Sequence, residues 1–371
     1  MSFFKKKTTQ TIAGTFAIYY FYENYFKKMK KEVTTLKKMA QILNLSISTV
    51  SRALNNHPDI SASTTKKVND LAKKLNYMPN IFAKGFRQHK TNIIGVIIPN
   101  IISYFTSTIL KEILLQAEIK GYRVIISETN NDVKKEKEML LTMLQFGVDG
   151  ILMSLSKNTK DIEPILYALN QKPLVLFDKV SAKIPCTQIV INEEEAAFKA
   201  IEHLINIGKK RIAIIKEFEY SYNSERRYQG YLKALKMNNI DIDEELILST
   251  DDISLKKGRR LTSQLISLKK RPDAIFSITD SAAIGCIQTL KKFNIKIPEE
   301  IAVIGFSNSL SSTIIEPNLT TIDQPGKRIG KLMVDLLIKE IEEPKESLIS
   351  KSIEIKTNLI IRESTFLANE L

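Results

Sequence analysis

Residues 46–55 read SISTVSRALN, a segment in which four hydroxyl side chains and one arginine surround an apolar spine. On a helix, Ile47, Val50 and Leu54 recur at steps of three and four residues, so they share one face and predict a buried stripe. The polar residues then lie on the other faces, where short side chains can contact phosphates or base edges without steric cost. A small solvated helix is the alternative interpretation.

Two more helical patterns flank this segment. The first begins at Thr35, a residue type that caps helices, and Asn44 after it tolerates a left-handed turn. Ser46 can cap the second helix, and either Ser61 or Ser63 can cap a third. Two helices joined by a turn of about three to four residues form the helix-turn-helix arrangement, whose second helix enters the major groove of DNA.

The basic residues are concentrated near the start of the chain. The formal net charge is +14 over 371 residues; residues 29–91 hold 12 Lys and Arg against 3 Asp and Glu, whereas residues 92–371 hold 38 against 37. A localised basic block favours a polyanionic partner, either nucleic acid or anionic lipid. The length suits two or three domains, and the composition of 43% apolar and 26% charged residues indicates a globular protein.

Eight short apolar runs alternate with helical segments from residue 92 onward. The runs are NIIGVIIP, YRVIISET, VDGILMS, PLVLFDK, RIAIIKE, EELILST, DAIFSIT and IAVIGFS. Strands that alternate with helices imply parallel sheets covered on both faces, and the rhythm occurs twice, so we predict two doubly wound α/β lobes. In such sheets ligands bind beyond the carboxyl ends of the strands, and two lobes placed edge to edge would share a cleft there.

The sequence lacks the signatures of several classes of site. The 13 glycines never occur as G-x-G, and neither G-x-S-x-G nor H-E-x-x-H is present. The three histidines are scattered, so we expect no metal cluster and no histidine-based catalysis. Cys186 and Cys286 lie a hundred residues apart, which indicates packing residues in a reduced cytoplasm. We therefore expect no cofactor and no enzyme activity.

The first 28 residues have a different character. Lys5, Lys6 and Lys7 precede the apolar run TIAGTFAIYYFY, a pattern similar to a secretory signal. The run is too short to span a bilayer, and no small-residue cleavage site follows it. We expect a disordered or artefactual extension with the true start at Met29, and no membrane partner.

Six motifs follow one another along the chain. They are TLKKMAQILNLSISTVSRALNNHPDIS, YMPNIFAKGFR, NIIGVIIPN, SERRYQGYLKAL, IPEEIAVIGFSNS and LTTIDQPGKRIGK. In this order they resemble the LacI family of bacterial transcription regulators, over residues 33–366. The resemblance implies a DNA-reading headpiece, a hinge helix and a two-lobed core similar to periplasmic sugar-binding proteins. It also implies a dimer that binds operator DNA and a small molecule in the cleft.

The resemblance assigns DNA contacts to the headpiece and the hinge. The matching positions are Thr35, Ser46, Ile47, Ser48, Thr49, Ser51, Arg52, Asn55, Thr64, Tyr77, Asn80, Ala83, Lys84 and Phe86. An arginine can bind guanine through two hydrogen bonds, worth about 1–3 kcal/mol of discrimination, whereas Ile47 offers only an apolar contact such as one with a thymine methyl. Simple solvation of the hydroxyls is the alternative.

The hinge departs from the family pattern at two positions. Phe86 stands where the family usually has a leucine that wedges into a base step. Phenylalanine is also a wedge type, so the function is expected to survive with a different preferred step. The alternative is that Phe86 packs only against its dimer mate. Gly85 replaces a commoner serine and should make hinge folding more dependent on DNA.

The resemblance also assigns effector contacts to the core. The matching positions are Phe105, Asp178, Arg227, Ile253, Thr279, Ser307, Asn308 and Gln324. A planar guanidinium can grip two neighbouring hydroxyls, which favours a sugar-like effector. Thr279, Ser307 and Ile253 replace a common asparagine, aspartate and aromatic residue, so we expect less stacking and less acidity than usual. The alternative role of Arg227 is a structural salt bridge.

These observations predict an N-terminal all-α headpiece followed by two lobes of periplasmic-binding-protein-like type. The expected parts are an extension over residues 1–32, a helix-turn-helix headpiece over 33–78, a hinge helix and linker over 79–91, and a core over 92–366. Within the core the N-lobe takes residues 92–191 and 323–346, and the C-lobe takes 192–322 and 347–366.

The predicted function is a cytoplasmic, homodimeric repressor that binds a pseudo-palindromic operator and is controlled by a carbohydrate effector. No heptad segment follows NLIIRES, so a dimer is expected rather than a coiled-coil tetramer. Two other classes remain open. One is a solute-binding module of periplasmic type without a DNA role, and the other is an α/β enzyme.

Overall fold

The computed structural model describes residues 34–78, 90–218, 221–343 and 351–366. The chain divides into two compact units, Met1–Lys84 and Gly85–Leu371. The predictions for the extension at 1–32 and for the hinge lie outside the described residues, except for the last two residues of the linker. No helix in the described part of the chain is long and apolar enough to cross a bilayer.

The first unit contains the three predicted short helices. They are α2 (Leu36–Leu43), α3 (Ile47–Leu54) and α4 (Ala62–Lys74). The hydroxyls of Thr35, Ser46 and Ser61 accept hydrogen bonds from backbone N–H groups of the first turns, at 3.2, 3.0 and 3.3 Å. Asn44 has a φ of 54°, which provides the left-handed turn between the first two helices. The three predicted caps are confirmed.

The headpiece is held together by a small apolar core. Its fully covered members come from all three helices and are Met39, Ala40, Val50, Ala53 and Val68. The prediction that Ile47 is buried was wrong, because its side chain is 49% exposed. The stripe of α3 begins at Val50 and continues through Ala53, while the first turn of the helix faces solvent.

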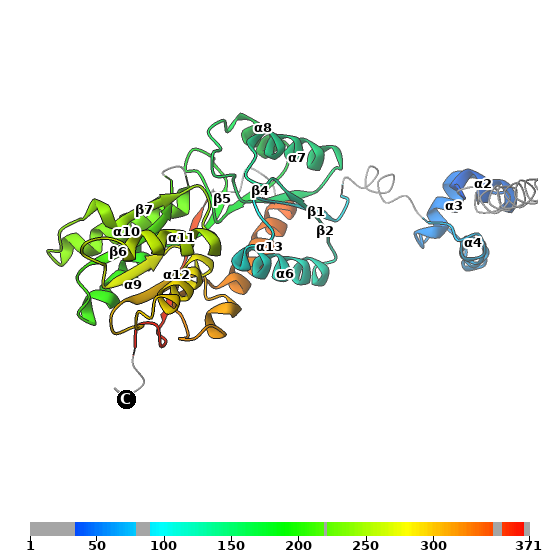
Figure 1. The fold of residues 1–371 in the computed structure, drawn as a ribbon. Coiled ribbons are helices and arrows are strands. Elements are labelled where there is room, and N and C mark those ends of the chain that lie inside the picture. The colour runs from blue at the N-terminus through cyan, green and yellow to red at the C-terminus, as the bar shows by residue number, and fades with distance from the viewer. Residues whose placement is uncertain (1–33, 79–89, 219–220, 344–350, 367–371) are drawn as a thin grey trace, which may run out of the picture. The chain divides into compact units, whose positions relative to one another are not determined.

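The second unit consists of two doubly wound lobes, as predicted (Figure 1). The N-lobe sheet has the order β11-β5-β4-β3-β1-β2 and is parallel throughout. Its strands are β1 (Ile93–Ile98), β2 (Arg123–Glu128), β3 (Gly150–Met153), β4 (Leu174–Phe177), β5 (Thr187–Ile191) and β11 (Ser352–Ile355). Its helices are α6 (Tyr104–Ile119), α7 (Val133–Gln145), α8 (Glu163–Gln171) and α13 (Gly326–Glu342).

The C-lobe sheet repeats this plan in the order β12-β10-β9-β8-β6-β7, with β12 antiparallel at the edge. Its strands are β6 (Ile212–Glu217), β7 (Ile247–Thr250), β8 (Ala274–Ser277), β9 (Ala302–Phe306), β10 (Thr320–Asp323) and β12 (Asn358–Ile360). Its helices are α9 (Glu193–Asn206), α10 (Tyr222–Met237), α11 (Leu255–Ile266) and α12 (Asp280–Lys292), with short 3₁₀ turns at Glu244–Leu246 and Leu310–Thr313.

Each sheet is covered on both faces, which explains its continuous apolar strands. In β1, Ile94, Val96 and Ile98 join the cluster under α6 and α13, whereas Ile93 and Ile97 join the cluster under α7 and α8. Both faces of β1 are therefore buried, as expected for a central parallel strand. In the C-lobe, α9 and α10 cover one face and α11 and α12 cover the other.

One predicted boundary was wrong. We expected residues 347–366 to belong to the C-lobe, but β11 pairs in parallel with β5 of the N-lobe sheet. The chain returns to the C-lobe only at β12, which pairs with β10. The short Ser352–Ile355 strand therefore completes the edge of the N-lobe before the last crossover.

Both cysteines are buried and free, in agreement with their predicted packing role. Burial raises the pKa of each thiol to about 12. The thiolate is the reactive species, so a thiol with a raised pKa is unreactive near neutral pH. Neither residue has the electropositive, exposed surroundings of a redox-active cysteine.

Glu340 on α13 gives the first testable prediction. Burial raises the pKa of Glu340, while the hydroxyl of Thr187, which donates to the carboxylate at 2.5 Å, opposes the shift. Ionisation therefore destabilises the folded chain as pH rises from the ordinary carboxyl pKa through the raised one. Glu340→Gln keeps an acceptor for Thr187 and should raise the Tm near neutral pH.

The gain in Tm should disappear in acid, below the ordinary carboxyl pKa, where the wild-type Glu340 is protonated in both the folded and unfolded states. Thermal unfolding from mildly acidic to neutral pH measures this dependence. Glu342→Gln is the matched control, because Glu342 has an exposed side chain near Lys90. A gain that is equal at all pH values would contradict the assignment to Glu340 ionisation.

Candidate functional site

The N-terminal turn of α3 presents an exposed cluster of hydroxyl groups. The Ser46 hydroxyl lies 2.7 Å from that of Ser48 and 2.8 Å from that of Thr49. Ile47, between them, exposes about half of its side chain, so an apolar group stands beside three hydroxyls. This arrangement can offer both hydrogen bonds and one apolar contact to the edge of a base pair.

Arg52 is exposed on the same helix, and its side chain has no hydrogen-bond or ion-pair partner among the described residues of the headpiece. The amide of Asn55, by contrast, donates to the carbonyl of Ser51 at 2.8 Å and fixes the end of the helix. Arg52 therefore has its full set of donors available to an external ligand.

The other predicted DNA contacts differ in their surroundings. Thr35 is exposed and serves as an N-cap, and Thr64 accepts a hydrogen bond from Ser61 at 2.9 Å. Tyr77 is half-buried and packs against the headpiece core, so it also has a structural role. The predicted contacts Asn80, Ala83, Lys84 and Phe86 lie outside the described residues.

In the core, the R-x-x-G motif of α10 sets the position of the predicted effector residue Arg227. A Cβ atom on Gly230 would lie 2.1 Å from the carbonyl oxygen of Glu194, so only glycine lets α10 pack this closely on α9. The close packing brings Arg227 to Glu193 at the start of α9, where Nε donates to the carboxylate at 2.6 Å. Both side chains are buried.

Arg227 also joins the ends of two C-lobe strands. Its Nη1 donates to the carbonyl of Ile278 at 2.6 Å, directly after β8. Its guanidinium lies 3.5 Å from the centroid of the Phe306 ring, at the end of β9. Thr279 and Ser307 follow these two residues, so Arg227, Thr279 and Ser307 lie at the same carboxyl edge of the sheet.

Asp178 contributes the N-lobe side of this region. It follows β4 with a φ of 59°, an uncommon conformation for an aspartate. Its Oδ1 accepts from the amide of Asn223 at 2.6 Å, across the two lobes, and its Oδ2 accepts from Lys179 at 3.1 Å. This hydrogen bond to Asn223 joins the N-lobe to α10 of the C-lobe. Because Asn223 is one turn before Arg227 on α10, the two lobes meet close to Arg227.

Three buried polar atoms near this edge have no hydrogen-bond partner in the part of the chain that the structure describes. They are Oδ1 of Asn223, Oγ of Ser277 at the end of β8, and Nε2 of Gln324 just after β10. An unpaired buried polar group costs about 1–3 kcal/mol unless a ligand or water satisfies it. The strand ends therefore carry the hydrogen-bonding capacity expected of a site for a polar ligand.

A cavity beside Ser221 and Tyr222, at the start of α10, lies between the lobes. It has a volume of about 350 Å³ and is lined by N-lobe residues around Lys157 and Lys179 and by C-lobe residues around Tyr222 and Glu225. This volume is in the range of small-molecule sites. The Phe105 side chain is buried near the N-terminus of α6 and forms part of the apolar cluster that runs through both lobes.

Three other predicted effector residues already have partners within the protein. Asn308 donates to Asp323 at 2.8 Å and accepts from Arg362 at 2.6 Å, so both ends of its amide are used within the protein. Thr279 caps α12 by accepting from Ala282 at 3.3 Å. Ile253 packs against the apolar clusters of the C-lobe.

Sequence reasoning did not identify Glu193 or Asn223. Asn223 could have been found, because it is one turn before Arg227 and therefore on the same face of the helix. Glu193 opens a run of three glutamates at the start of α9, which is also the ordinary pattern of a helix N-terminus. The contact with Arg227, which only the structure shows, distinguishes Glu193 from the next two glutamates. Burial raises the pKa of Glu193, and the charge of Arg227 opposes this shift.

Comparison with known proteins agrees with both units. Residues 35–80 match the model of bacterial regulatory proteins of the lacI family, and residues 201–365 match a periplasmic binding protein-like domain. The NTD biosynthesis operon regulator NtdR of Bacillus subtilis (strain 168) is 35% identical over 332 residues, covering 89% of this chain and 99% of NtdR. Catabolite control protein A of Priestia megaterium is 31% identical with the same coverage.

Among solved structures, the lac repressor dimer bound to operator and the anti-inducer ONPF matches with a TM-score of 0.80 and 25% identity. The match covers 91% of this chain and all of that one. These findings confirm the resemblance inferred from the sequence motifs. With relatives above 30% identity along nearly their whole length, this chain belongs to the lacI family of bacterial regulatory proteins.

Proposed function

We propose that this protein is a transcriptional repressor that binds a pseudo-palindromic operator as a dimer and responds to a sugar-like effector. The observation that carries the proposal is the exposed N-terminal turn of α3, with Ile47 and three hydroxyls. The same helix carries Arg52, whose side chain has no partner among the described residues. The headpiece is also the basic part of the chain, which suits contacts with phosphates. An operator-binding role gives the protein a cytoplasmic site of action and requires no enzymatic step.

The polar groups at the strand ends support a polyhydroxylated effector. The carboxylate of Asp178 accepts hydrogen bonds and the guanidinium of Arg227 donates them. Nε2 of Gln324, which has no partner among the described residues, adds another donor. A set of donors and acceptors at the ends of the strands fits hydroxyl groups, which can both donate and accept. Ile253 gives an apolar surface without ring stacking, so a saturated ring fits better than a purine.

An exposed apolar surface of the N-lobe supports dimerisation. Leu114, Leu115 and Ile119 on α6 each expose between 45% and 65% of the side chain. They lie next to β2, which is the open edge strand of its sheet. A contiguous apolar surface beside a free strand edge favours contact with another protein surface. A second copy of the chain would bring two headpieces to the two halves of a palindrome.

Replacement of Arg52 tests the DNA-binding proposal. Arg52→Ala should weaken binding to the preferred duplex by about 1–3 kcal/mol, because the fork of donors that can take a guanine is lost. The preferred duplex is first selected from a random pool with the full-length chain. Fluorescence anisotropy at fixed ionic strength then gives the affinities of the wild-type chain and the variant.

Arg260→Ala is the matched control, since Arg260 is an exposed arginine on α11 of the core. It should leave DNA affinity unchanged. Enrichment of no duplex over random competitor would overturn the proposed function. Equal losses in the Arg52 and Arg260 variants would show only a general charge effect.

A further inference from the structure

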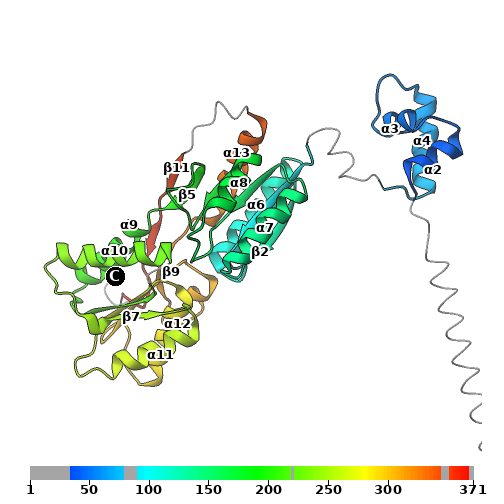
Figure 2. The same ribbon diagram turned by 90° about the horizontal axis from the view of Figure 1, so that it is seen from above.

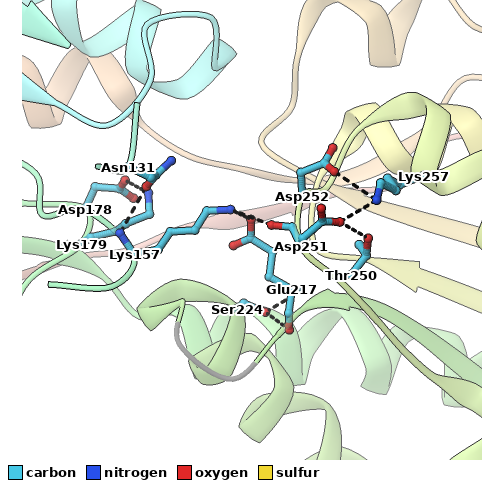
Figure 3. A network of polar contacts seen from close by, with 10 residues as sticks. All are labelled: Asn131, Lys157, Asp178, Lys179, Glu217, Ser224, Thr250, Asp251, Asp252 and Lys257. Carbon is cyan, nitrogen blue, oxygen red and sulfur yellow. Dashed lines mark hydrogen bonds and ion pairs between the residues drawn. The ribbon is translucent and has the colours of Figure 1, made fainter. Parts of the chain in front are cut away.

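A second polar bridge joins the two lobes at Lys157, which also lines the cavity described above. Lys157 follows β3 in the N-lobe, whereas Glu217 ends β6 and Asp251 follows β7 in the C-lobe. The Nζ atom of Lys157 forms an ion pair with the Glu217 carboxylate and donates to the Asp251 carbonyl at 3.2 Å (Figure 3). None of these three residues is among the predicted effector contacts.

The N-lobe side of this bridge is fixed by its own lobe. The backbone N–H of Lys157 donates to the side chain of Asn131 at 3.2 Å. The preceding Ser156 donates its N–H to the buried carboxylate of Glu136 at 2.6 Å, and its hydroxyl lies 2.9 Å from that of Thr129. The loop that carries Lys157 is therefore held in place without help from the C-lobe.

The C-lobe side is fixed in the same way, as Figure 3 shows. The N–H of Glu217 donates to the hydroxyl of Ser224 at 3.0 Å, which ties the end of β6 to the start of α10. Lys257 donates to the Asp251 carboxylate at 2.6 Å. Because the backbone on both sides is already ordered, forming the ion pair costs less conformational entropy than it would between free loops.

The pair is neither fully exposed nor fully buried. The side chains of Lys157 and Glu217 are 23% and 15% exposed. At this depth water and salt screen the attraction less than at the surface, yet both charges stay partly hydrated when the pair opens. The pair can therefore form and break without a large desolvation cost, as a reversible contact between moving parts requires.

We propose that Lys157 and Glu217 form a latch that favours closure of the two lobes when no effector is bound. The latch sets the population of closed protein through two residues that are not among the predicted effector contacts. An effector that prefers closed lobes then binds with an affinity reduced by the fraction that is open. The link to effector affinity rests on the proposed function, but the latch itself concerns only the two lobes and needs neither effector nor DNA.

Distances between the lobes of the full-length, effector-free chain test the latch. Spin labels at Lys137→Cys on α7 and Gln264→Cys on α11, both exposed positions, report on the lobe separation by pulsed EPR. The native cysteines are buried and should not take up label. Lys157→Glu and Glu217→Lys should each shift the ratio of closed to open protein toward the open form by about fivefold.

The double variant with both exchanges restores an ion pair in reversed order and should restore the closed population. Lys183→Glu makes the same charge change at an exposed lysine of the N-lobe and should leave the distances unchanged. If Lys157→Glu does not fold, Lys157→Met removes the charge with less disturbance and should give the same opening.

Unchanged distances in the single variants, or no recovery in the double variant, would overturn the latch. High salt should open the wild-type chain and leave Lys157→Met unaffected, since only the wild type has an attraction to screen. These outcomes are read without any operator or effector. Failure of the latch is therefore distinct from failure of the proposed function, which is judged by selection of a duplex.

Discussion

Arg227→Ala should lower the free energy of unfolding of the core by about 3–5 kcal/mol and abolish the response to effector. The stability loss follows from Glu193, whose carboxylate would be left buried without the guanidinium that donates to it at 2.6 Å. The carbonyl of Ile278 would also lose its donor. Urea unfolding followed by circular dichroism measures the first effect, and calorimetric titration with candidate sugars measures the second.

The dependence of this loss on pH has a definite sign. Burial already raises the pKa of Glu193, and removal of Arg227 takes away the positive charge that opposes the rise. At lower pH Glu193 accepts a proton and the buried charge disappears. The variant should therefore lose less stability in mildly acidic solution than at neutral pH. A loss that is constant with pH would contradict the role of the Glu193 charge.

A double variant separates the structural and ligand-binding roles of Arg227. Arg227→Met combined with Glu193→Leu replaces the buried pair by apolar side chains of similar volume, a change that is often neutral. Its stability should return close to that of the wild type, while the response to effector should remain absent. Recovery of the effector response in this variant would show that Arg227 serves only as a salt bridge. A double variant as unstable as Arg227→Ala would contradict the account of the buried charge.

The alternation of strands and helices in the core could be predicted from the sequence, because a strand that is buried on both faces is a short run of apolar residues. All eight apolar runs became strands of two sheets, since a parallel strand covered on both sides is apolar throughout. The edge strand Ser352–Ile355 has the alternating sequence SIEI and is mostly exposed. Its short pattern does not say which lobe it joins, because that depends on where the chain crosses back.

The position of Ile47 shows a different limit of sequence reasoning. Spacing places Ile47, Val50 and Leu54 on one face of a helix, and this spacing is real. Whether the first turn is buried depends on how far the neighbouring helices extend. The spacing of apolar residues along α3 carries no information on that. The exposed Ile47 is consistent with the apolar base contact that the family resemblance implied for it.

The contact between Arg227 and Glu193 could not be derived from sequence, because 34 residues separate the two side chains. Gly230 makes the contact possible because it lets α10 approach α9 closely. The need for glycine at this position is evident only from the structure, in which the carbonyl of Glu194 faces Gly230. Figure 2 shows α9 and α10 side by side in the C-lobe. Asn308 illustrates the converse, since its motif position suggested a ligand contact while Arg362 and Asp323 occupy its amide.

Val50→Asp should abolish DNA binding by unfolding the headpiece while leaving the core intact. Val50 is fully buried in a cluster with only four other fully covered residues, Met39, Ala40, Ala53 and Val68. A core of this size supplies only a few kcal/mol of stability, and an unpaired buried carboxylate costs at least that much. The free energy of unfolding of the headpiece would therefore become negative at neutral pH, and the headpiece would unfold.

Hydrogen exchange with mass spectrometry on the full-length chain measures this effect directly. Amides of α2, α3 and α4 should exchange rapidly in the Val50→Asp variant, whereas those of β1, β3 and the other central strands should remain protected. The core is a separate compact unit with its own apolar clusters, so its thermal unfolding should not change. Loss of protection in the central strands as well would show that the two units fold together.

Ser48→Asp is the matched control, because it introduces the same charge on the same helix at an exposed position. It should leave the protection of all three helices unchanged and still weaken DNA binding, since a carboxylate beside the Ser46 hydroxyl repels phosphates and cannot donate a hydrogen bond to a thymine O4 or a guanine O6. The two variants thus lose DNA binding for different physical reasons. If Ser48→Asp bound the selected duplex as tightly as the wild type, the exposed turn of α3 would not be the surface that contacts DNA, even though Val50→Asp had shown that the headpiece must be folded.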